Sequence, residues 1–269
     1  MATKEDRGMS LAAVEFHSQQ EYARGVHDLF EPLLEAYPPA KDWFCLDVGS
    51  GPNLNASLIL AKRVREVVAI DFDDVSLARA RALVSSMSQS LNVEEKTLAA
   101  KIRLEKVNAE NMEGIADNEF SCVATIGGLR HCLHWGKAYS ESMRVLESGG
   151  IFYLCGEVIM PQDMIDIWKL IDAAQGRNEY YWESRSVLEE RISREPVQIV
   201  RAIWDQRFRR SLGAFLDPVQ DKQSADRLRE GAESLLRKYQ AETQTTYDDG
   251  TGDLTFSYRV ASFVLRKKA

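Results

Sequence analysis

The feature of the sequence that most constrains its fold is a regular alternation of two patterns between residues 43 and 158. Short apolar runs such as "WFCLDV", "EVVAID" and "FSCVATIG" are separated by stretches with helical spacing, such as "NASLILAKRV" and "KAYSESMRVLE". Such alternation is typical of a parallel sheet with helices on both faces. The sequence therefore predicts an α/β fold with a doubly wound, mostly parallel sheet.

We interpret residues 1–269 as a single domain with an addition at each end. In residues 10–38, apolar side chains recur at helical spacing until "YPP" stops the pattern, which predicts an N-terminal helical segment. Residues 241–267 hold two alternating runs joined by a turn rich in Gly and Asp. This arrangement predicts a C-terminal antiparallel β-hairpin.

The alternation fails between residues 160 and 240. Several stretches there have apolar residues three or four positions apart, which is the spacing of one helix face. We therefore expect a helical cap inserted after the fifth strand. One of its predicted helices carries Val200, Trp204 and Phe208.

The charge balance argues against a nucleic-acid partner. The chain has 34 basic and 41 acidic residues, a net charge of −7, and no basic run longer than the terminal "RKK". Binding to a phosphate backbone needs a cluster of cations, which this pattern does not provide. No apolar run approaches the roughly 20 residues that span a bilayer, so we expect no membrane association.

The four cysteines, Cys45, Cys122, Cys132 and Cys155, lack the spacing of a CxxC motif or a Cys/His metal site. Three of them lie in apolar, strand-like runs, where cysteine behaves as a small hydrophobic residue. The N-terminus is charged and has no apolar segment typical of a signal peptide. We therefore expect a cytoplasmic protein without a bound metal ion.

The stretch "DVGSGPN" follows the first predicted strand, where a doubly wound sheet binds its ligand. Gly49 and Gly51 let the backbone turn tightly and approach a ligand. Leu54 stands where the dinucleotide fingerprint requires a third glycine, which argues against a pyrophosphate. Asp47 would repel a phosphate but can orient an ammonium group. These residues favour a cationic adenosine ligand without phosphate.

From about residue 40 to residue 158, the sequence resembles the class I S-adenosylmethionine-dependent methyltransferases, in particular their small-molecule, type 11-like group. The resemblance rests on "LDVGSGPN", "VVAIDFDD", "VNAENM", "SCVATIGGLRHCLHW" and "MRVLESGGIFYLCGEV". It implies S-adenosyl-L-methionine as the cofactor and a sheet of seven strands, to which the C-terminal hairpin is the antiparallel addition.

The resemblance also implies a set of cofactor contacts. Asp71 would hold the ribose hydroxyls, and Asn108 and Ala109 would line the adenine edge. The full set of implied cofactor-binding residues is Asp47, Gly49, Gly51, Asp71, Phe72, Asn108, Ala109 and Ile126. Two positions depart from the family pattern: Asn53 replaces a glycine, and Asn108 replaces an acidic residue. Asparagine still offers an acceptor for the adenine amino group.

Asp71 ends an apolar run about 24 residues after Asp47, where an acidic side chain meets a ribose diol in such folds. A helix cap is the alternative role for this residue. Because Asp73 or Asp74 can cap the following helix, we favour ribose binding for Asp71.

The candidate catalytic residues are His131, His134 and Glu157. The histidines lie just past the fourth predicted strand, near where the family places the methyl acceptor, and histidine can remove a proton from a hydroxyl near neutral pH. Packing at a helix start is the alternative for His131. Glu157 ends the fifth strand, and pairing with a structural arginine is its alternative role.

Aromatic residues are the candidates for the acceptor pocket. Trp168 and Trp204 show helical spacing and are expected in the cores of their own helices. Tyr180, Tyr181 and Trp182 show no such period, so they are better pocket candidates, although they can equally pack the cap against the sheet. The resemblance places His17 and Tyr22 over the cofactor. The candidate substrate-binding residues are Tyr22, Trp135, Tyr180, Tyr181 and Trp182.

Together these observations predict methyl transfer from S-adenosyl-L-methionine to an oxygen or nitrogen of a small organic acceptor, such as a secondary metabolite. One alternative is a protein of this fold that binds the cofactor without methyl transfer, as a cyclisation or rearrangement catalyst or a binding protein. A macromolecule methyltransferase is the other, although a basic face and an N-P-P-[YF]-like loop are absent from the sequence. The acceptor and the oligomeric state stay open.

Overall fold

A mixed β-sheet runs through the centre of the protein in the computed structural model, which describes residues 25–176, 179–216, 221–248 and 253–269. The strand order is β3-β2-β1-β4-β5-β8-β6, and β7 pairs with β8 beside this path. The strands are β1 (Phe44–Val48), β2 (Glu66–Asp71), β3 (Ile102–Lys106), β4 (Phe120–Ile126), β5 (Leu146–Ile159), β6 (Val197–Ser211), β7 (Thr246–Asp248) and β8 (Asp253–Lys267).

The sheet has a parallel part and an antiparallel part. β1, β2, β3, β4 and β5 pair in parallel, whereas β8 is antiparallel to β5, β6 and β7. The structure confirms the predicted α/β fold with a mostly parallel central sheet and antiparallel C-terminal strands. The main path holds seven strands, the expected number, but it includes the unexpected β6, whereas β7, the first strand of the predicted C-terminal hairpin, pairs with β8 beside the path.

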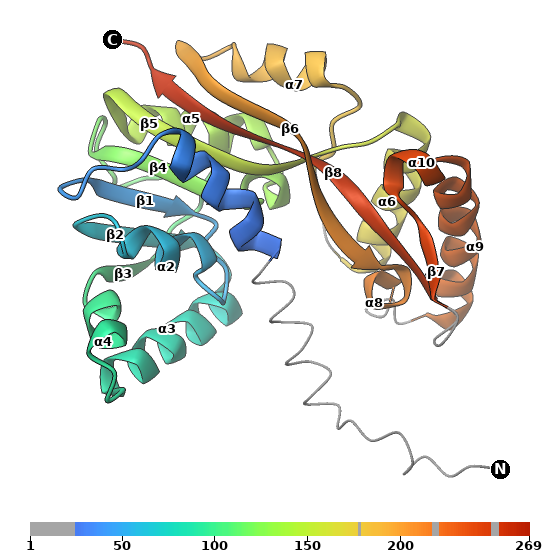
Figure 1. The fold of residues 1–269 in the computed structure, drawn as a ribbon, viewed down its shortest axis with the longest axis horizontal. Coiled ribbons are helices and arrows are strands. Elements are labelled where there is room, and N and C mark those ends of the chain that lie inside the picture. Colours follow the sequence, from blue (N-terminus) through green and yellow to red (C-terminus); the bar gives the residue numbers. More distant parts are fainter. Residues whose placement is uncertain (1–24, 177–178, 217–220, 249–252) are drawn as a thin grey trace.

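Helices cover both faces of the sheet (Figure 1). Residues 25–36 are helical, within the predicted N-terminal segment. The other helices are α2 (Asn55–Ala61), α3 (Asp74–Gln89), α4 (Val93–Ala99), the 3₁₀ helix η2 (Leu129–His131), α5 (Trp135–Val145), α6 (Gln162–Ala174), α7 (Arg185–Ile192), α8 (Leu212–Leu216), α9 (Lys222–Lys238) and α10 (Gln240–Thr243).

Two hydrophobic cores lie on opposite faces of the sheet because successive strand residues point to opposite sides. On β1, Cys45 belongs to one core and Leu46 to the other. The first core includes Leu33 and the fully buried Trp168 of α6, and the second includes Tyr139 of α5. Trp168 is therefore a core residue of its own helix, as its spacing predicted.

The prediction that residues 160–240 are helical is wrong for their centre. This region contains α6, α7, α8 and α9, but it also contains the long strand β6. Register shifts after Ile199 and after Ile203 interrupt the pairing of β6 with β8. Each shift changes which face the following side chains occupy, so the period of two is lost and a helical spacing is mimicked. The misassigned residues are Val200, Trp204 and Phe208.

β6 and β8 extend well beyond the parallel strands, and α6, α8, α9 and α10 gather at their far end (Figure 1). The arrow of β1 points toward this half of the molecule. In the described part of the chain, no helix is both long and apolar enough to cross a membrane.

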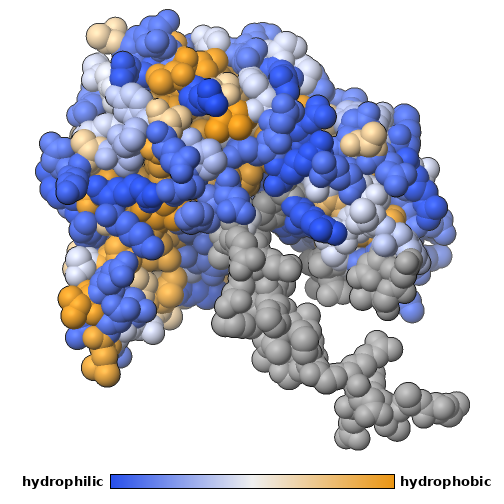
Figure 2. All heavy atoms as spheres, viewed as in Figure 1, coloured by the Kyte–Doolittle hydropathy of each residue, from blue (hydrophilic) through white to orange (hydrophobic). Residues whose placement is uncertain are grey.

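Hydrophilic residues cover most of the face shown in Figure 2. An exception is the tip formed where α3 is followed by α4, at the lower left, where Leu91 and Val93 are exposed. This tip lies in the same half of the molecule as the parallel strands (Figure 1).

Candidate functional site

The loop after β1 (residues 49–54) makes a left-handed turn. The φ angles are +67° at Gly49, +63° at Gly51 and +53° at Leu54. A Cβ added at Gly49 would lie 2.8 Å from the Cα of Gly128, in the loop after β4 (residues 127–134). Only glycine permits this approach, so the loops after β1 and β4 touch at the point where the strand order reverses.

Leu54 is an unusual residue in this turn, because bulky side chains rarely adopt a positive φ. Its side chain is fully buried, and it precedes the first residue of α2. Burial in the first core therefore holds a backbone conformation that the sequence alone would assign to glycine.

Asp47 joins the end of β1 to α2. Its Oδ2 accepts hydrogen bonds from the backbone N–H of Ser57 at 3.0 Å and from the Ser57 hydroxyl at 2.5 Å. Burial raises the pKa of Asp47 to about 6, although both hydrogen bonds act in the opposite direction. The ionisation of this carboxyl group is therefore poised to respond to a nearby cation.

Asp71 joins the end of β2 to the loop after β1. Its Oδ2 accepts a hydrogen bond from the Gly51 N–H at 2.9 Å, and its Oδ1 accepts one from the Asp73 N–H at 3.0 Å. Asp73 is the N-cap of α3, since its side chain accepts from the Ser76 N–H at 2.7 Å. The cap of α3 is therefore Asp73 and not Asp71, in agreement with the expectation from the sequence that Asp73 or Asp74 caps this helix.

Three further residues of the expected cofactor-binding set, including the two expected at the adenine, lie on two neighbouring loops. Phe72 is 67% exposed directly after Asp71, and Ala109 is half-buried after β3. The side-chain oxygen of Asn108 accepts a hydrogen bond from the Glu110 N–H at 2.9 Å. This bond fixes the turn that presents Ala109.

The two candidate histidines both lie on the loop after β4 but have different partners. The Nδ1 of His134 lies 2.8 Å from the Glu110 Oε2, and its backbone N–H donates to the Glu110 Oε1 at 2.9 Å. The Nδ1 of His131 lies 3.7 Å from the Glu179 Oε1. His134 is therefore anchored to the loop after β3, whereas His131 faces the predicted cap.

Sequence reasoning missed both carboxylates that accompany the histidines. Glu110 follows the adenine motif directly, and Glu179 directly precedes the aromatic run. Although partial burial opposes ionisation, hydrogen bonds from the backbone and ring of His134 lower the pKa of Glu110. Glu179 also lies 3.8 Å from the Nε of Arg130. Both carboxylates are positioned to stabilise a protonated imidazole.

Glu157 is fully buried at the end of β5. Its Oε2 accepts hydrogen bonds from the indole N–H of Trp135 at 3.1 Å and of Trp182 at 2.7 Å. Burial raises the pKa of Glu157, which the two indoles and the charge of Arg130 counteract. Trp135 and Trp182 are themselves buried, so this candidate base and two candidate pocket residues form an internal cluster.

The segment of residues 179–182 lies against the loop after β4. The Tyr180 N–H donates to the Arg130 carbonyl at 2.7 Å, and the Tyr180 hydroxyl donates to the Leu133 carbonyl at 3.1 Å. Tyr180 is half-buried, whereas Tyr181 is buried and its hydroxyl donates to the Asp172 carboxylate at 2.7 Å. Tyr180 is thus the aromatic residue of this segment that can reach a ligand. The candidate Tyr22, like His17, lies outside the described residues.

A cavity of about 30 Å³ lies between helix 25–36 and the ends of β4 and β5. It has room for about one water molecule, so an acceptor must displace side chains to enter here. Ile126 lines it, together with Val26, Leu29, Gly127, Arg130, Gly156 and Val260.

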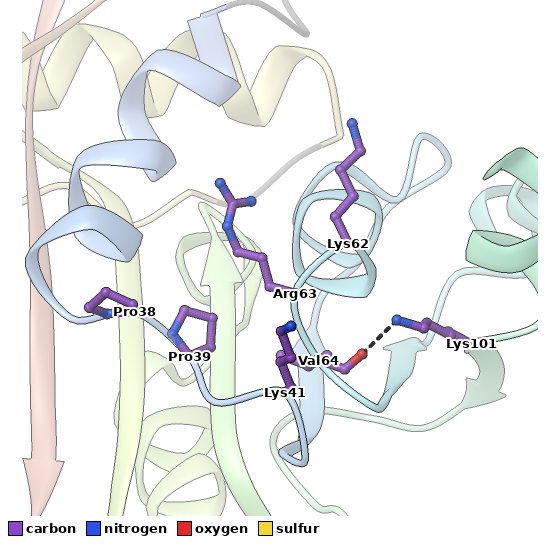
Figure 3. A pocket seen from close by; sticks show the side chains of 7 residues that line it. All are labelled: Pro38, Pro39, Lys41, Lys62, Arg63, Val64 and Lys101. Atoms are coloured by element: carbon purple, nitrogen blue, oxygen red, sulfur yellow. Dashed lines mark hydrogen bonds between the residues drawn. The ribbon is translucent and has the colours of Figure 1, made fainter.

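A larger groove of about 480 Å³ lies at the amino ends of the parallel strands β1, β2 and β3 (Figure 3). Two of its four cations have structural partners: the Lys101 ammonium donates to the carbonyls of Ala61 and Val64, and Arg63 pairs with Glu31. Ligands of doubly wound sheets bind at the carboxyl ends of the strands, so this groove is not the cofactor site. It is lined by Pro38, Pro39, Lys41, Lys62, Arg63, Val64 and Lys101.

The cysteines lie mostly in the interior of the protein. All four cysteines are free thiols, and only Cys132 is not fully buried. Among the residues that the structure describes, no group of three His, Cys, Asp or Glu side chains is arranged to hold a metal ion.

Residues 46–154, from β1 to β5, match the sequence model of a family described as Methyltransferase domain. No curated protein matches the sequence. A putative methyltransferase from Bacillus halodurans has a similar structure with a TM-score of 0.71 and 17% sequence identity, over 89% of this chain and 99% of that chain.

Two further structures share the fold at low identity. The cyclase SpnF has a TM-score of 0.57 at 18% identity, over 93% of this chain and 82% of its own. A geranyl diphosphate C-methyltransferase from Streptomyces coelicolor, solved with Mg²⁺, geranyl diphosphate and S-adenosyl-L-homocysteine, has a TM-score of 0.55 at 14% identity, over 96% of this chain and 87% of its own.

The fold is that of the class I S-adenosylmethionine-dependent methyltransferases. Residues 46–154 match the model of a methyltransferase domain, and this match indicates S-adenosyl-L-methionine as the cofactor.

Proposed function

We propose that the protein transfers a methyl group from S-adenosyl-L-methionine to an oxygen or nitrogen of a small organic acceptor. The observation that carries this proposal is the contact of Asp71 with Gly51, which fixes the left-handed loop at the carboxyl ends of β1 and β2. This is where a doubly wound sheet binds an adenosine ligand.

In this proposal, the Asp71 carboxylate holds the ribose hydroxyls. Each of its oxygens already accepts one backbone N–H, and a carboxylate has about four acceptor positions, so capacity for two hydroxyls remains. Asp47 favours the positively charged methionine part, while Gly49 and Gly51 let the backbone approach it. Asn108 and Ala109 would line the adenine edge, and Phe72 and Ile126 would complete the cofactor contacts.

We place the acceptor between the loop after β4 and the segment of residues 179–182. Both histidines have a carboxylate partner, but His131 faces this side whereas His134 is held against the loop after β3, so His131 is the better candidate base of the two. A hydroxyl acceptor would give its proton to His131 as the methyl group moves from sulfur to oxygen, and Glu179 would stabilise the imidazolium. The cofactor supplies the methyl group on a sulfonium that needs no further activation, so position and exclusion of water supply much of the rate.

The cap, residues 160–240, would select the acceptor, and a negative net charge fits a small molecule better than a nucleic acid. Cys45 and Cys122 are buried free thiols that lie opposite each other on the adjacent strands β1 and β4. Thiols that stay reduced at such close positions fit the reducing cytoplasm. A cofactor-binding catalyst without methyl transfer is the second candidate, because the cyclase SpnF shares this fold.

The test is release of S-adenosyl-L-homocysteine by the purified protein over a panel of hydroxyl and amine metabolites, with mass spectrometry of each acceptor. A gain of one methyl group, lost in Asp71→Ala, is the expected result. Conversion of an acceptor without a change in mass would instead favour the cyclisation class.

A further inference from the structure

We infer that Glu157 is a positioning residue: its buried carboxylate ties the start of α5 to residues 179–182 and so shapes the acceptor side of the site. This inference rests on the proposed methyl transfer. It gives Glu157 a role that differs from that of a base, because the residue has no exposed surface and acts through two tryptophans.

The tie consists of one oxygen and two donors from distant parts of the chain. The Oε2 of Glu157 accepts from Trp135, which directly follows His134, and from Trp182, two residues after Tyr180. The two indole rings also meet edge to face, with centroids 5.0 Å apart. Because one oxygen accepts from both indoles, the position of each ring depends on that of the carboxyl group.

Backbone contacts extend the tie in both directions. The Trp182 N–H donates to the Val158 carbonyl at 2.9 Å, and the Met160 N–H donates to the Trp182 carbonyl at 3.0 Å, which docks the segment on the end of β5. Tyr180 bonds the loop after β4 through its own N–H and hydroxyl. Displacing Trp182 would therefore move Tyr180 relative to His131.

Burial of the Glu157 carboxyl group costs folding free energy that an apolar side chain at this position would not cost. Its second oxygen, Oε1, is buried without a hydrogen-bond partner among the described residues. An unsatisfied buried oxygen destabilises a fold, and an apolar side chain of similar volume would avoid that cost. A buried polar group instead specifies one arrangement of its partners.

Three variants separate positioning from other roles. Glu157→Gln keeps an oxygen for both indoles, Glu157→Leu removes it, and Trp182→Phe keeps a ring but removes one donor. We expect Glu157→Leu and Trp182→Phe to raise the acceptor KM by about tenfold or more, with affinity for S-adenosyl-L-homocysteine within about twofold of wild type. Glu157→Gln should restore most of the acceptor affinity and keep the wild-type pH profile.

Amide hydrogen exchange supplies a measurement that needs no acceptor. We expect faster exchange at residues 179–182 and 129–134 in Glu157→Leu and Trp182→Phe, and near-normal exchange in Glu157→Gln. If Glu157→Leu does not fold, Trp182→Phe and Trp135→Phe carry the test.

Two results would overturn the inference. One is unchanged exchange in the folded variants, and the other is a large loss of kcat with a lost pH limb in Glu157→Gln, which would make Glu157 the base. Because exchange and S-adenosyl-L-homocysteine affinity are measured without methyl transfer, failure of the proposed reaction is distinguishable from failure of the tie.

Discussion

The Asp71 carboxylate accepts a hydrogen bond from the Gly51 N–H at 2.9 Å, across the ends of β2 and β1. The bond links the proposed ribose-binding residue to the loop that turns around the methionine part of the cofactor. Removing this side chain should therefore disturb two parts of the cofactor site at once.

We expect Asp71→Ala to weaken S-adenosyl-L-homocysteine binding by about 1.5 to 3 kcal/mol, because a charge-assisted, bidentate contact is lost. Isothermal titration calorimetry measures the change. Asp73→Ala is the matched control, since it removes the cap of α3 and should lower the melting temperature without changing this affinity. Unchanged affinity in a folded Asp71→Ala variant would show that Asp71 does not hold the ribose.

The raised pKa of Asp47 predicts a pH-dependent stability. The folded protein holds the proton up to about pH 6, whereas an ordinary carboxyl group of this type loses it near 3.8. The stabilisation from protonated Asp47 is fully present below the lower value and is lost as pH rises through the higher one. Urea unfolding at a series of pH values should show this fall, and Asp47→Asn should lack it.

Ser57→Ala provides the control for this effect. Because the Ser57 hydroxyl favours ionised Asp47, its loss should move the fall in stability to higher pH. Parallel stability curves for the wild type and Asp47→Asn would show that Asp47 ionises as readily in the folded as in the unfolded chain.

The different partners of the two histidines predict different kinetics. If the acceptor is a hydroxyl, His131→Gln should lower kcat by roughly 10² to 10⁴ with little change in cofactor affinity. The rising limb of the pH profile, in the range where histidine titrates, should vanish with it. His134→Gln and Glu110→Gln should resemble each other and keep that limb, because their pair anchors the loop after β3.

Near-normal turnover in His131→Gln, with an unchanged pH profile, would contradict assisted deprotonation by this residue. If His134→Gln and Glu157→Gln also keep the profile, catalysis proceeds by proximity and orientation, and a neutral amine becomes the better acceptor.

The parts of this protein that could be predicted from the sequence are those set by local chemistry. Gly49 and Gly51 predict a tight turn, which the structure shows with positive φ angles. Asp73 follows Asp71 closely enough to act as the helix cap in its place. The partners of the histidines could not be predicted, because Glu110 and Glu179 come from other loops and meet the histidines only in the folded chain.

β6 is an element whose secondary structure could not be predicted from local sequence. Its pairing with β8 outweighs the helical spacing of its apolar residues, and the two register shifts that hide its period depend on that partner strand. Glu157 is similar, since its position after a strand suggested chemistry, whereas its two indole donors place it in the interior.

The segment of residues 179–182 offers the last prediction, in which two neighbouring tyrosines should behave differently. Tyr180 is half-buried and bonds the loop after β4, so Tyr180→Ala should change the acceptor KM far more than the affinity for S-adenosyl-L-homocysteine. Tyr181 is buried and donates to Asp172 inside the cap. Tyr181→Phe should therefore lower the free energy of unfolding by about 1 to 3 kcal/mol with little effect on KM, because one hydrogen bond to a buried carboxylate is lost. Steady-state kinetics and urea unfolding of both variants check the contrast. Equal losses of acceptor and cofactor affinity in Tyr180→Ala would make the segment a structural support and place acceptor selection elsewhere in the cap.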